Sequence, residues 1–277
     1  MKHIHIISPS GVILPNYITL AQKRLESWGF RVSISQHALA QHGRFAGTPQ
    51  QRLDDINAAL ANPDIDIILC SRGGYGLQQI VDQIQLPNRP KDAWPLLVGF
   101  SDITVLHSLM NLHGVPSLHA SMCKDLATLP ETSPALQELR LALKQGAKYI
   151  NPHIAQSPFK SSTIIGGNLS ILYGLQDTAY SLHRIIDSCT EAPVLLIEDI
   201  DEQHYHIDRM LNNLRLSGIF SRLSGVIIGQ FTNCPDDPKM GCSLQETINQ
   251  MLAPYGYPVL FNAPYGHIDE NQPIVLL

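Results

Sequence analysis

The stretch LLVGFSDITVLHSLM, residues 96–110, decides the fold. An apolar run of strand length leads into a turn at Gly99–Asp102, and the apolar residues after the turn recur at the spacing of a helix. Similar units surround it, with predicted strands at 4–7, 31–35, 65–70 and 95–100 and predicted helices at 18–28, 77–84 and from 49 to about 60. Strand–helix units repeated at this length predict a parallel α/β sheet with right-handed crossovers.

The alternation of strands and helices is lost between residues 144 and 161, which read KQGAKYINPHIAQSPFKS. Gly, Pro and polar residues in such a stretch are typical of a link between domains. Short strands dominate the sequence beyond it, so a mixed, barrel-like second domain is expected there. The apolar end Ile274–Leu277 predicts a terminal strand or helix packed into the core. The predicted division is an α/β domain over 1–145, a linker over 146–162 and a β-rich domain over 163–277.

Composition narrows the class of protein. The chain has 277 residues, of which 44% are hydrophobic and 16% charged, as in an ordinary globular protein. Its formal net charge of −5 and its lack of a Lys/Arg cluster argue against nucleic-acid binding. The five cysteines show no CxxC spacing, which indicates free thiols in a reducing compartment. With no signal-peptide pattern and no bilayer-length apolar run, we expect a cytoplasmic protein without membrane contact.

Ser101 is the first candidate for chemistry. A serine between a strand and a helix is exposed above the sheet, and amides at the helix N-terminus can stabilise a developing oxyanion. The pattern is an incomplete G-x-S-x-G nucleophile elbow, because Ile103 stands where the second Gly would be. The alternative is that Ser101 or Asp102 merely caps the helix.

The turn Ser71-Arg72-Gly73-Gly74-Tyr75-Gly76 is the second candidate, again placed after an apolar strand. Its glycines let the backbone approach a ligand and point N–H groups at it. A glycine amide here would be one oxyanion donor opposite the amide of Asp102. A phosphate or dinucleotide loop is a weaker interpretation, because the spacing fits neither G-x-G-x-x-G nor the P-loop. A glycine turn without chemistry is the remaining alternative.

A carboxylate and a histidine complete the candidate set. Glu198 ends the apolar run Val194–Ile197 and is placed to hold an imidazole in one tautomer. His267 follows Gly266 in a late loop and is a candidate general base. The rival bases are His107, His113 and His119. Asp199, Asp201 and Glu202 are interpreted as a solvated loop, and His204 and His206 as exposed loop residues and not metal ligands.

Taken together, these segments resemble the LD-carboxypeptidase family of serine peptidases, the muramoyl-tetrapeptide carboxypeptidases with the microcin-C immunity peptidases as relatives. The resemblance runs from end to end of the chain, and its strength comes from six motifs in the right order. Those motifs are Ser8-Pro9-Ser10-Gly11, Ser71–Gly76, Gly99-Phe100-Ser101-Asp102-Ile103-Thr104, Gly166-Gly167-Asn168-Leu169, Leu196-Ile197-Glu198-Asp199 followed by Ile207-Asp208-Arg209, and Gly266-His267. The segment His119-Ala120-Ser121-Met122 departs from the family pattern, in which a Gly or Pro is expected nearer the Met.

The resemblance implies a catalytic triad of Ser101 as nucleophile, His267 as general base and Glu198 as the orienting carboxylate. It also implies an oxyanion hole formed by the backbone amides of Gly74 and Asp102, next to Gly73 in a substrate-binding turn. The implied fold is a Rossmann-like N-terminal domain with a barrel-like C-terminal domain. The implied protein is a cytoplasmic homodimer that uses no metal or other cofactor.

The implied reaction is cleavage of the L,D amide bond to the terminal D-alanine of murein tetrapeptides during cell-wall peptide recycling. Arg72 is a candidate for the bidentate contact with the free carboxylate of that substrate, although a structural role at the turn is an equal alternative. Two other functions stay open. One is a related serine amidase acting on peptidyl-nucleotides such as microcin C, and the other is a non-catalytic nucleotide-binding α/β protein.

Overall fold

The computed structural model describes all residues, 1–277, and contains two sheets. The first sheet has the strand order β10-β5-β4-β3-β1-β2. Its strands β1 to β5 pair in parallel, and β10 is antiparallel to β5. The bounds are β1 His3–Ile7, β2 Arg31–Ile34, β3 Ile67–Cys70, β4 Leu96–Gly99, β5 Ser117–His119 and β10 Ile274–Leu276. The predicted parallel α/β arrangement of the first half is confirmed.

Helices cover both faces of this sheet, as the apolar strands require. Alternate strand residues divide between two cores: Ile4 and Ile6 belong to one, and Ile7 to the other. The helices on the first face are α1 Pro15–Ser27, α4 Cys123–Thr128 and α5 Pro134–Gln145, and those on the second are α2 Pro49–Ala61 and α3 Thr104–Leu112. Helix α2 begins as predicted, with Thr48 as N-cap in a capping box with Gln51 and Pro49 at the first position.

The helix predicted over 77–84 is wrong. This segment forms two short 3₁₀ turns, η1 Leu77–Gln79 and η2 Val81–Gln83. Ile80 lies between them at φ −136°, outside the helical region, so the backbone cannot continue as an α-helix. Leu77, Ile80 and Val81 are all buried in the second core. Their apolar spacing therefore reflects burial, which the sequence pattern cannot separate from helical periodicity.

The second sheet has the order β6-β7-β8-β9, and all of its strands pair in parallel. Its strands are β6 Ile164–Asn168, β7 Val194–Ile200, β8 Gly225–Thr232 and β9 Val259–Leu260, and the helices of this half are α6 Pro152–Ala155, α7 Leu169–Gly174, α8 Leu182–Ser188, α9 His204–Leu216 and α10 Leu244–Leu252. The α/β fold class is confirmed, while the barrel-like description of this half remains a prediction. No helix of the structure is both long enough and apolar enough to cross a bilayer.

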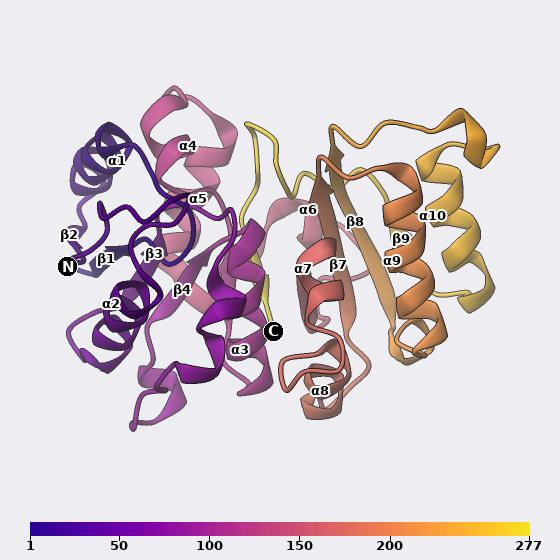
Figure 1. Cartoon of the computed structure of the whole chain (residues 1–277), viewed down its shortest axis with the longest axis horizontal. Helices are drawn as coiled ribbons and strands as arrows, with labels where there is room; N and C mark the ends of the chain where they lie inside the picture. Colours follow the sequence, from indigo (N-terminus) through magenta and orange to yellow (C-terminus); the bar gives the residue numbers. More distant parts are fainter.

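The two sheets meet where β6 approaches the start of α3. Figure 1 shows the two halves side by side, with the yellow C-terminal segment returning between them. That segment carries β10, which adds to the first sheet beside β5. Thr104 Oγ1 accepts a hydrogen bond of 3.0 Å from the amide of Asn168. Gly167 has φ +135°, and a Cβ atom added there would lie 2.5 Å from Thr104 Oγ1, so only glycine fits this contact.

Gly167→Ala tests the importance of that approach. We expect a loss of about 3 kcal/mol in the free energy of unfolding, because a steric overlap adds to the backbone strain. Gly256→Ala is the matched control, since Gly256 also has positive φ but open space around its Cα. It is expected to cost about 1 kcal/mol. Urea unfolding of both variants measures the difference, and equal losses would contradict the close-packed contact.

Candidate active site

Ser101 lies at the end of β4, where the chain turns into η4 Ser101–Ile103 and then α3. Its φ of +68° is in the left-handed region that residues other than glycine rarely adopt. Neither Ser101 nor Asp102 caps the helix, because no side-chain cap bond is present at η4 or α3. The capping alternative is therefore wrong. Ser101 is half-buried at the strand end, and its backbone conformation is unfavourable for a residue other than glycine. Such strained residues cluster at functional sites, which supports a functional role for Ser101.

Asp102 instead fastens the neighbouring loops. Its Oδ2 accepts hydrogen bonds from Ser10 Oγ at 2.6 Å and from the Leu77 amide at 3.1 Å. Burial raises the pKa of Asp102, and the two hydrogen bonds and the charge of Arg52 oppose that rise. Arg52 is itself fully buried and donates to the carbonyl oxygens of Pro9 and Gly76. These contacts hold the glycine turn and the Ser101 turn in fixed relation.

The glycine turn lies directly against Ser101. A Cβ atom added to Gly73 would lie 2.7 Å from Ser101 Cβ and 2.9 Å from its Oγ. Gly74 has φ +111°, and neither its amide nor that of Asp102 donates to a backbone carbonyl in the turns and loops. Both amides are thus free to donate to a ligand. The turn leads into η1 and not into a longer helix, so it lacks the helix N-terminus of a phosphate-binding loop.

Arg72 makes a structural contact at the glycine turn. Its side chain is exposed, and Nη1 donates to the carbonyl oxygen of Val12 at 2.8 Å. This contact ties the glycine turn to the loop after β1. The contact with a substrate carboxylate remains a prediction.

Glu198 and His267 are brought together as a pair. Glu198 is fully buried on β7, and its Oε2 lies 2.8 Å from His267 Nδ1. Two glycines make room for the carboxylate. A Cβ atom added to Gly266 would lie 3.0 Å from Glu198 Oε2, and one added to Gly229 would lie 3.0 Å from Glu198 Cβ. Gly266 also has φ +125°, so glycine is required both for the backbone angle and for the close approach.

The charges of this pair support each other. Burial favours a raised pKa for Glu198, but His119 and His267 outweigh it and lower the pKa to about 2. Burial favours a lowered pKa for His267, but the hydrogen bond and charge of Glu198 outweigh it and raise the pKa. Glu198 is therefore ionised near neutral pH and can only accept a hydrogen bond. His267 must carry its proton on Nδ1, which leaves Nε2 of the neutral ring free to accept a proton.

Ser101 and His267 lie in the same region without a hydrogen bond between them. The ring centroid of Phe100, the residue before Ser101, is 4.8 Å from that of His267. Nδ1 of His267 contacts Glu198, and its backbone carbonyl accepts from Thr232, but no bond to Ser101 Oγ forms. Nucleophile–base contacts are commonly loose in the absence of substrate. The structure thus joins two of the three predicted triad members directly.

The rival histidines lie in other surroundings. His107 is fully buried between Ser117 Oγ and the Gly99 carbonyl oxygen, and burial lowers its pKa to about 3. His113 lies against Trp94 at a centroid distance of 6.2 Å. His119 is buried with Nε2 3.8 Å from Glu198 Oε1.

Two interpretations of the acidic segment need correction. Asp199 is not solvated: it is buried on β7 and accepts hydrogen bonds from Asn168 Nδ2 and the Ser170 amide. Burial, followed by the charge of Glu198, raises the pKa of Asp199 to about 6. His204 is likewise buried, with Nε2 2.8 Å from Thr247 Oγ1. No group of three or more His, Cys, Asp and Glu side chains is arranged to hold a metal ion.

Sequence reasoning missed the supporting roles of Ser10, Arg52 and Asp199. Arg52 carried a usable signal, because an arginine beside Leu53 on the buried face of a predicted helix requires buried partners. Ser10 belonged to a quoted motif, but its partner Asp102 lies 92 residues away in the sequence. Such a pairing is fixed by the fold and leaves no local pattern.

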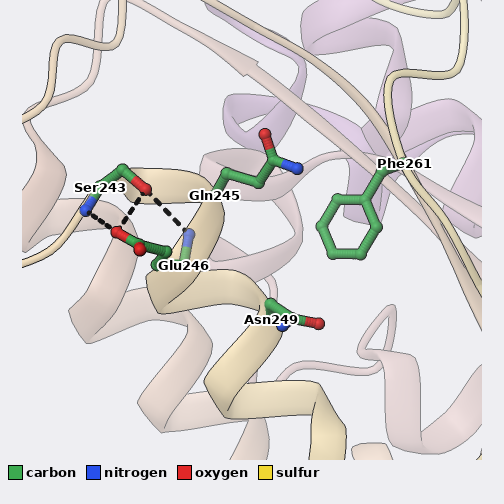
Figure 2. Close-up of a pocket in the computed structure, with 5 residues that line it drawn as sticks. All are labelled: Ser243, Gln245, Glu246, Asn249 and Phe261. Atoms are coloured by element: carbon green, nitrogen blue, oxygen red, sulfur yellow. Dashed lines mark hydrogen bonds between the residues drawn. The ribbon is translucent and has the colours of Figure 1, made fainter.

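A separate hollow of about 420 Å³ lies at the start of α10 (Figure 2) and contains none of the predicted site residues. Two of its polar lining residues, Ser243 and Glu246, form the capping box of α10, because each side chain bonds the other's backbone amide. The other lining residues are Gln245, Asn249 and Phe261.

The chain matches known proteins over both of its halves. Residues 4–120 match the family model of the LD-carboxypeptidase N-terminal domain, and residues 161–277 match that of the C-terminal domain. The murein tetrapeptide carboxypeptidase of Pseudomonas aeruginosa is 30% identical over 97% of this chain and 89% of its own length. Among solved structures, the muramoyltetrapeptide carboxypeptidase of Oxalobacter formigenes has a TM-score of 0.81 at 23% identity, covering 99% of this chain and 92% of that one. The microcin C7 self-immunity protein MccF, in complex with aspartyl sulfamoyl adenosine, also has a TM-score of 0.81, at 18% identity over 99% and 91% of the two chains.

Both family models describe halves of one class of hydrolase, the carboxypeptidases. Together they span most of the sequence, one over strands β1 to β5 and the other over strands β6 to β10. The chain therefore belongs to the LD-carboxypeptidase family.

Glu198→Gln tests the electrostatics of the pair. Because the carboxylate charge raises the pKa of His267, replacing it with a neutral amide is expected to lower that pKa. Titration of the His267 ring by NMR measures the change, and His37, which pairs with Asp55, serves as an internal reference in the same spectra. A His267 titration that stays in place would contradict the pairing.

Proposed function

We propose that this protein is a serine carboxypeptidase that removes the terminal D-alanine of murein tetrapeptides by cleaving an L,D amide bond. The observation that carries the proposal is the Glu198–His267 pair beside a strained serine, in a chain that matches the family over both halves. The name of the Pseudomonas aeruginosa relative supports the substrate class.

In the proposed mechanism, Ser101 Oγ attacks the scissile carbonyl carbon and Nε2 of His267 takes the hydroxyl proton. Glu198 stabilises the imidazolium through Nδ1–H. The amides of Gly74 and Asp102 donate to the oxyanion of the tetrahedral intermediate. His267 then protonates the amine of the leaving D-alanine. Water, deprotonated by the same ring, attacks the acyl-enzyme carbonyl and releases the shortened peptide.

The substrate-facing groups belong to the same proposal. Gly73 gives the peptide access to Ser101, because any side chain there would collide with the nucleophile. Arg72 would exchange or share its Val12 contact to bind the free carboxylate of D-alanine. We further propose a cytoplasmic homodimer acting in cell-wall peptide recycling, and a division of the chain at 146–162. The five unpaired cysteines support a reducing compartment.

A second candidate is a serine amidase that acts on peptidyl-nucleotides. The fold of this chain is similar to that of MccF in complex with aspartyl sulfamoyl adenosine, and this similarity supports the alternative. The same nucleophile and base would serve both reactions, and only pocket contacts would differ. Assaying murein tetrapeptide and a peptidyl-adenylate side by side, at equal concentrations, separates the two.

Ser101→Ala is expected to lower the rate of D-alanine release from murein tetrapeptide by roughly 10⁴-fold or more, because no other nucleophile replaces the hydroxyl. The measurement is chromatography of the free amino acid. Ser108→Ala is the matched control, since Ser108 lies on α3 behind the turn and is buried away from it. Activity of the Ser101 variant at the wild-type level would refute the mechanism.

The pH dependence of kcat/KM gives an independent check. His267 acts as a base only when neutral, and its pKa is raised by Glu198. Activity should therefore fall as the pH drops through a midpoint above about 6.5, the ordinary imidazole value. Glu198→Gln should move this acid limb to lower pH while decreasing the plateau. An acid limb that moves upward in that variant would contradict the assignment.

A further inference from the structure

His119 is a buried histidine without a hydrogen bond. It ends β5, its side chain is fully buried, and neither ring nitrogen has a partner. Buried polar atoms are nearly always paired, so two unpaired nitrogens on one ring need an explanation. The Oε1 atom of Glu198 is also unpaired, and it lies 3.8 Å from Nε2 of His119.

The carboxylate of Glu198 thus lies between two imidazoles that come from different parts of the chain. Oε2 contacts His267 Nδ1 at 2.8 Å, and Oε1 faces His119 Nε2. The distance of 3.8 Å is longer than a hydrogen bond, and a shift of less than 1 Å would bring it into range. That shift would satisfy an unpaired donor and an unpaired acceptor at once.

The surroundings of His119 fix its backbone and place aromatic rings beside its side chain. Residue 119 pairs with Gly99 on β4 and with Ile274 on β10, so its backbone is fixed on both sides. The Phe100 ring lies 5.7 Å from the His119 ring and 4.8 Å from the His267 ring. His107, 6.2 Å away, is already bonded through Nε2 to the Gly99 carbonyl oxygen.

We propose that His119 is a positioning residue, whose Nε2–H donates to Glu198 Oε1 in the working site and thereby fixes the other oxygen on His267. The inference rests on the proposed function, in which Glu198 orients the general base. His119 contacts neither substrate nor nucleophile in this role and acts through Glu198 alone. His119 belongs to the first sheet and Glu198 to the second, so the contact would also link the two sheets at the site.

The effect on protonation follows from charge. Asp199 and Asp201 also act on His267 and raise its pKa, while the His107 ring, bonded to Ser117 and Gly99, lies 6.2 Å from the His119 ring. None of these three groups donates to Glu198 Oε1. Loss of the His119 donor would therefore leave a buried carboxylate less stabilised. The active state of the pair is an ionised Glu198 beside a neutral His267. Without the donor this state is less stable relative to the protonated one, so the pKa of His267 is expected to rise.

The test compares His119→Phe, which keeps a ring but loses the donor, with His119→Gln, whose amide nitrogen can occupy the position of Nε2. In the Phe variant we expect the acid limb of kcat/KM to move to higher pH, with about a tenfold fall in kcat/KM on that limb. In the Gln variant the limb should return close to its wild-type position. His204→Phe, a change of another fully buried histidine on α9, should leave the limb unchanged.

An acid limb that stays in place in His119→Phe, with activity retained, would overturn the positioning role and leave the proposed function intact. Absence of D-alanine release by the wild-type protein would instead refute the proposed function. Imidazole ¹⁵N NMR of the wild-type chain tests the contact without any activity and serves if the Phe variant does not fold. A proton on Nε2 of His119 whose resonance shifts in Glu198→Gln supports the proposal, and a ring protonated only on Nδ1 overturns it.

Discussion

The hydrogen bond between His267 and the buried carboxylate of Glu198 is the interaction on which the site depends. A fully buried carboxylate is costly unless its charge is compensated, and here the compensation comes from imidazole rings. The bond forms only because Gly229 and Gly266 leave space against Glu198. Position 266 in the late loop therefore has to be glycine because of the space occupied by Glu198, which lies 68 residues earlier in the sequence. Sequence spacing alone gives no sign of that constraint.

The first half of the molecule holds Ser101 in an unfavourable backbone conformation. The surrounding contacts include Ser10 on Asp102, Arg52 on the Gly76 carbonyl oxygen, and Gly73 against Ser101 itself. Strain of this kind persists only where neighbours determine the geometry. The short loops after β1, β3 and β4 supply those neighbours, because parallel strands bring their carboxyl ends to one edge of the sheet.

Much of the fold could be read from local patterns. Apolar strands such as 65–70 and the cap at Thr48-Pro49 carry signals that tertiary contacts then reinforce. The segment 77–84 misled because Leu77, Ile80 and Val81 are buried at a spacing that a helix would also produce. Ser101, Glu198 and His267 could be nominated from strand-end and glycine contexts together with the family resemblance. The burial of Asp199 and the place of His119 beside Glu198 could not, since both depend on which strands become neighbours in space.

The return of the chain to β10 has a consequence for the order in which the molecule is completed. This strand is synthesised after all of the second sheet, yet it belongs to the first. Until it emerges from the ribosome, β5 remains an open edge whose unpaired backbone is available to other extended segments. Contacts between residues so far apart in sequence also slow folding, because a long loop must close before they form. The first sheet therefore gains its last strand only when the C-terminal residues are in place, and Ile274 and Leu276 of that strand also complete the core beside β6, β7 and β8.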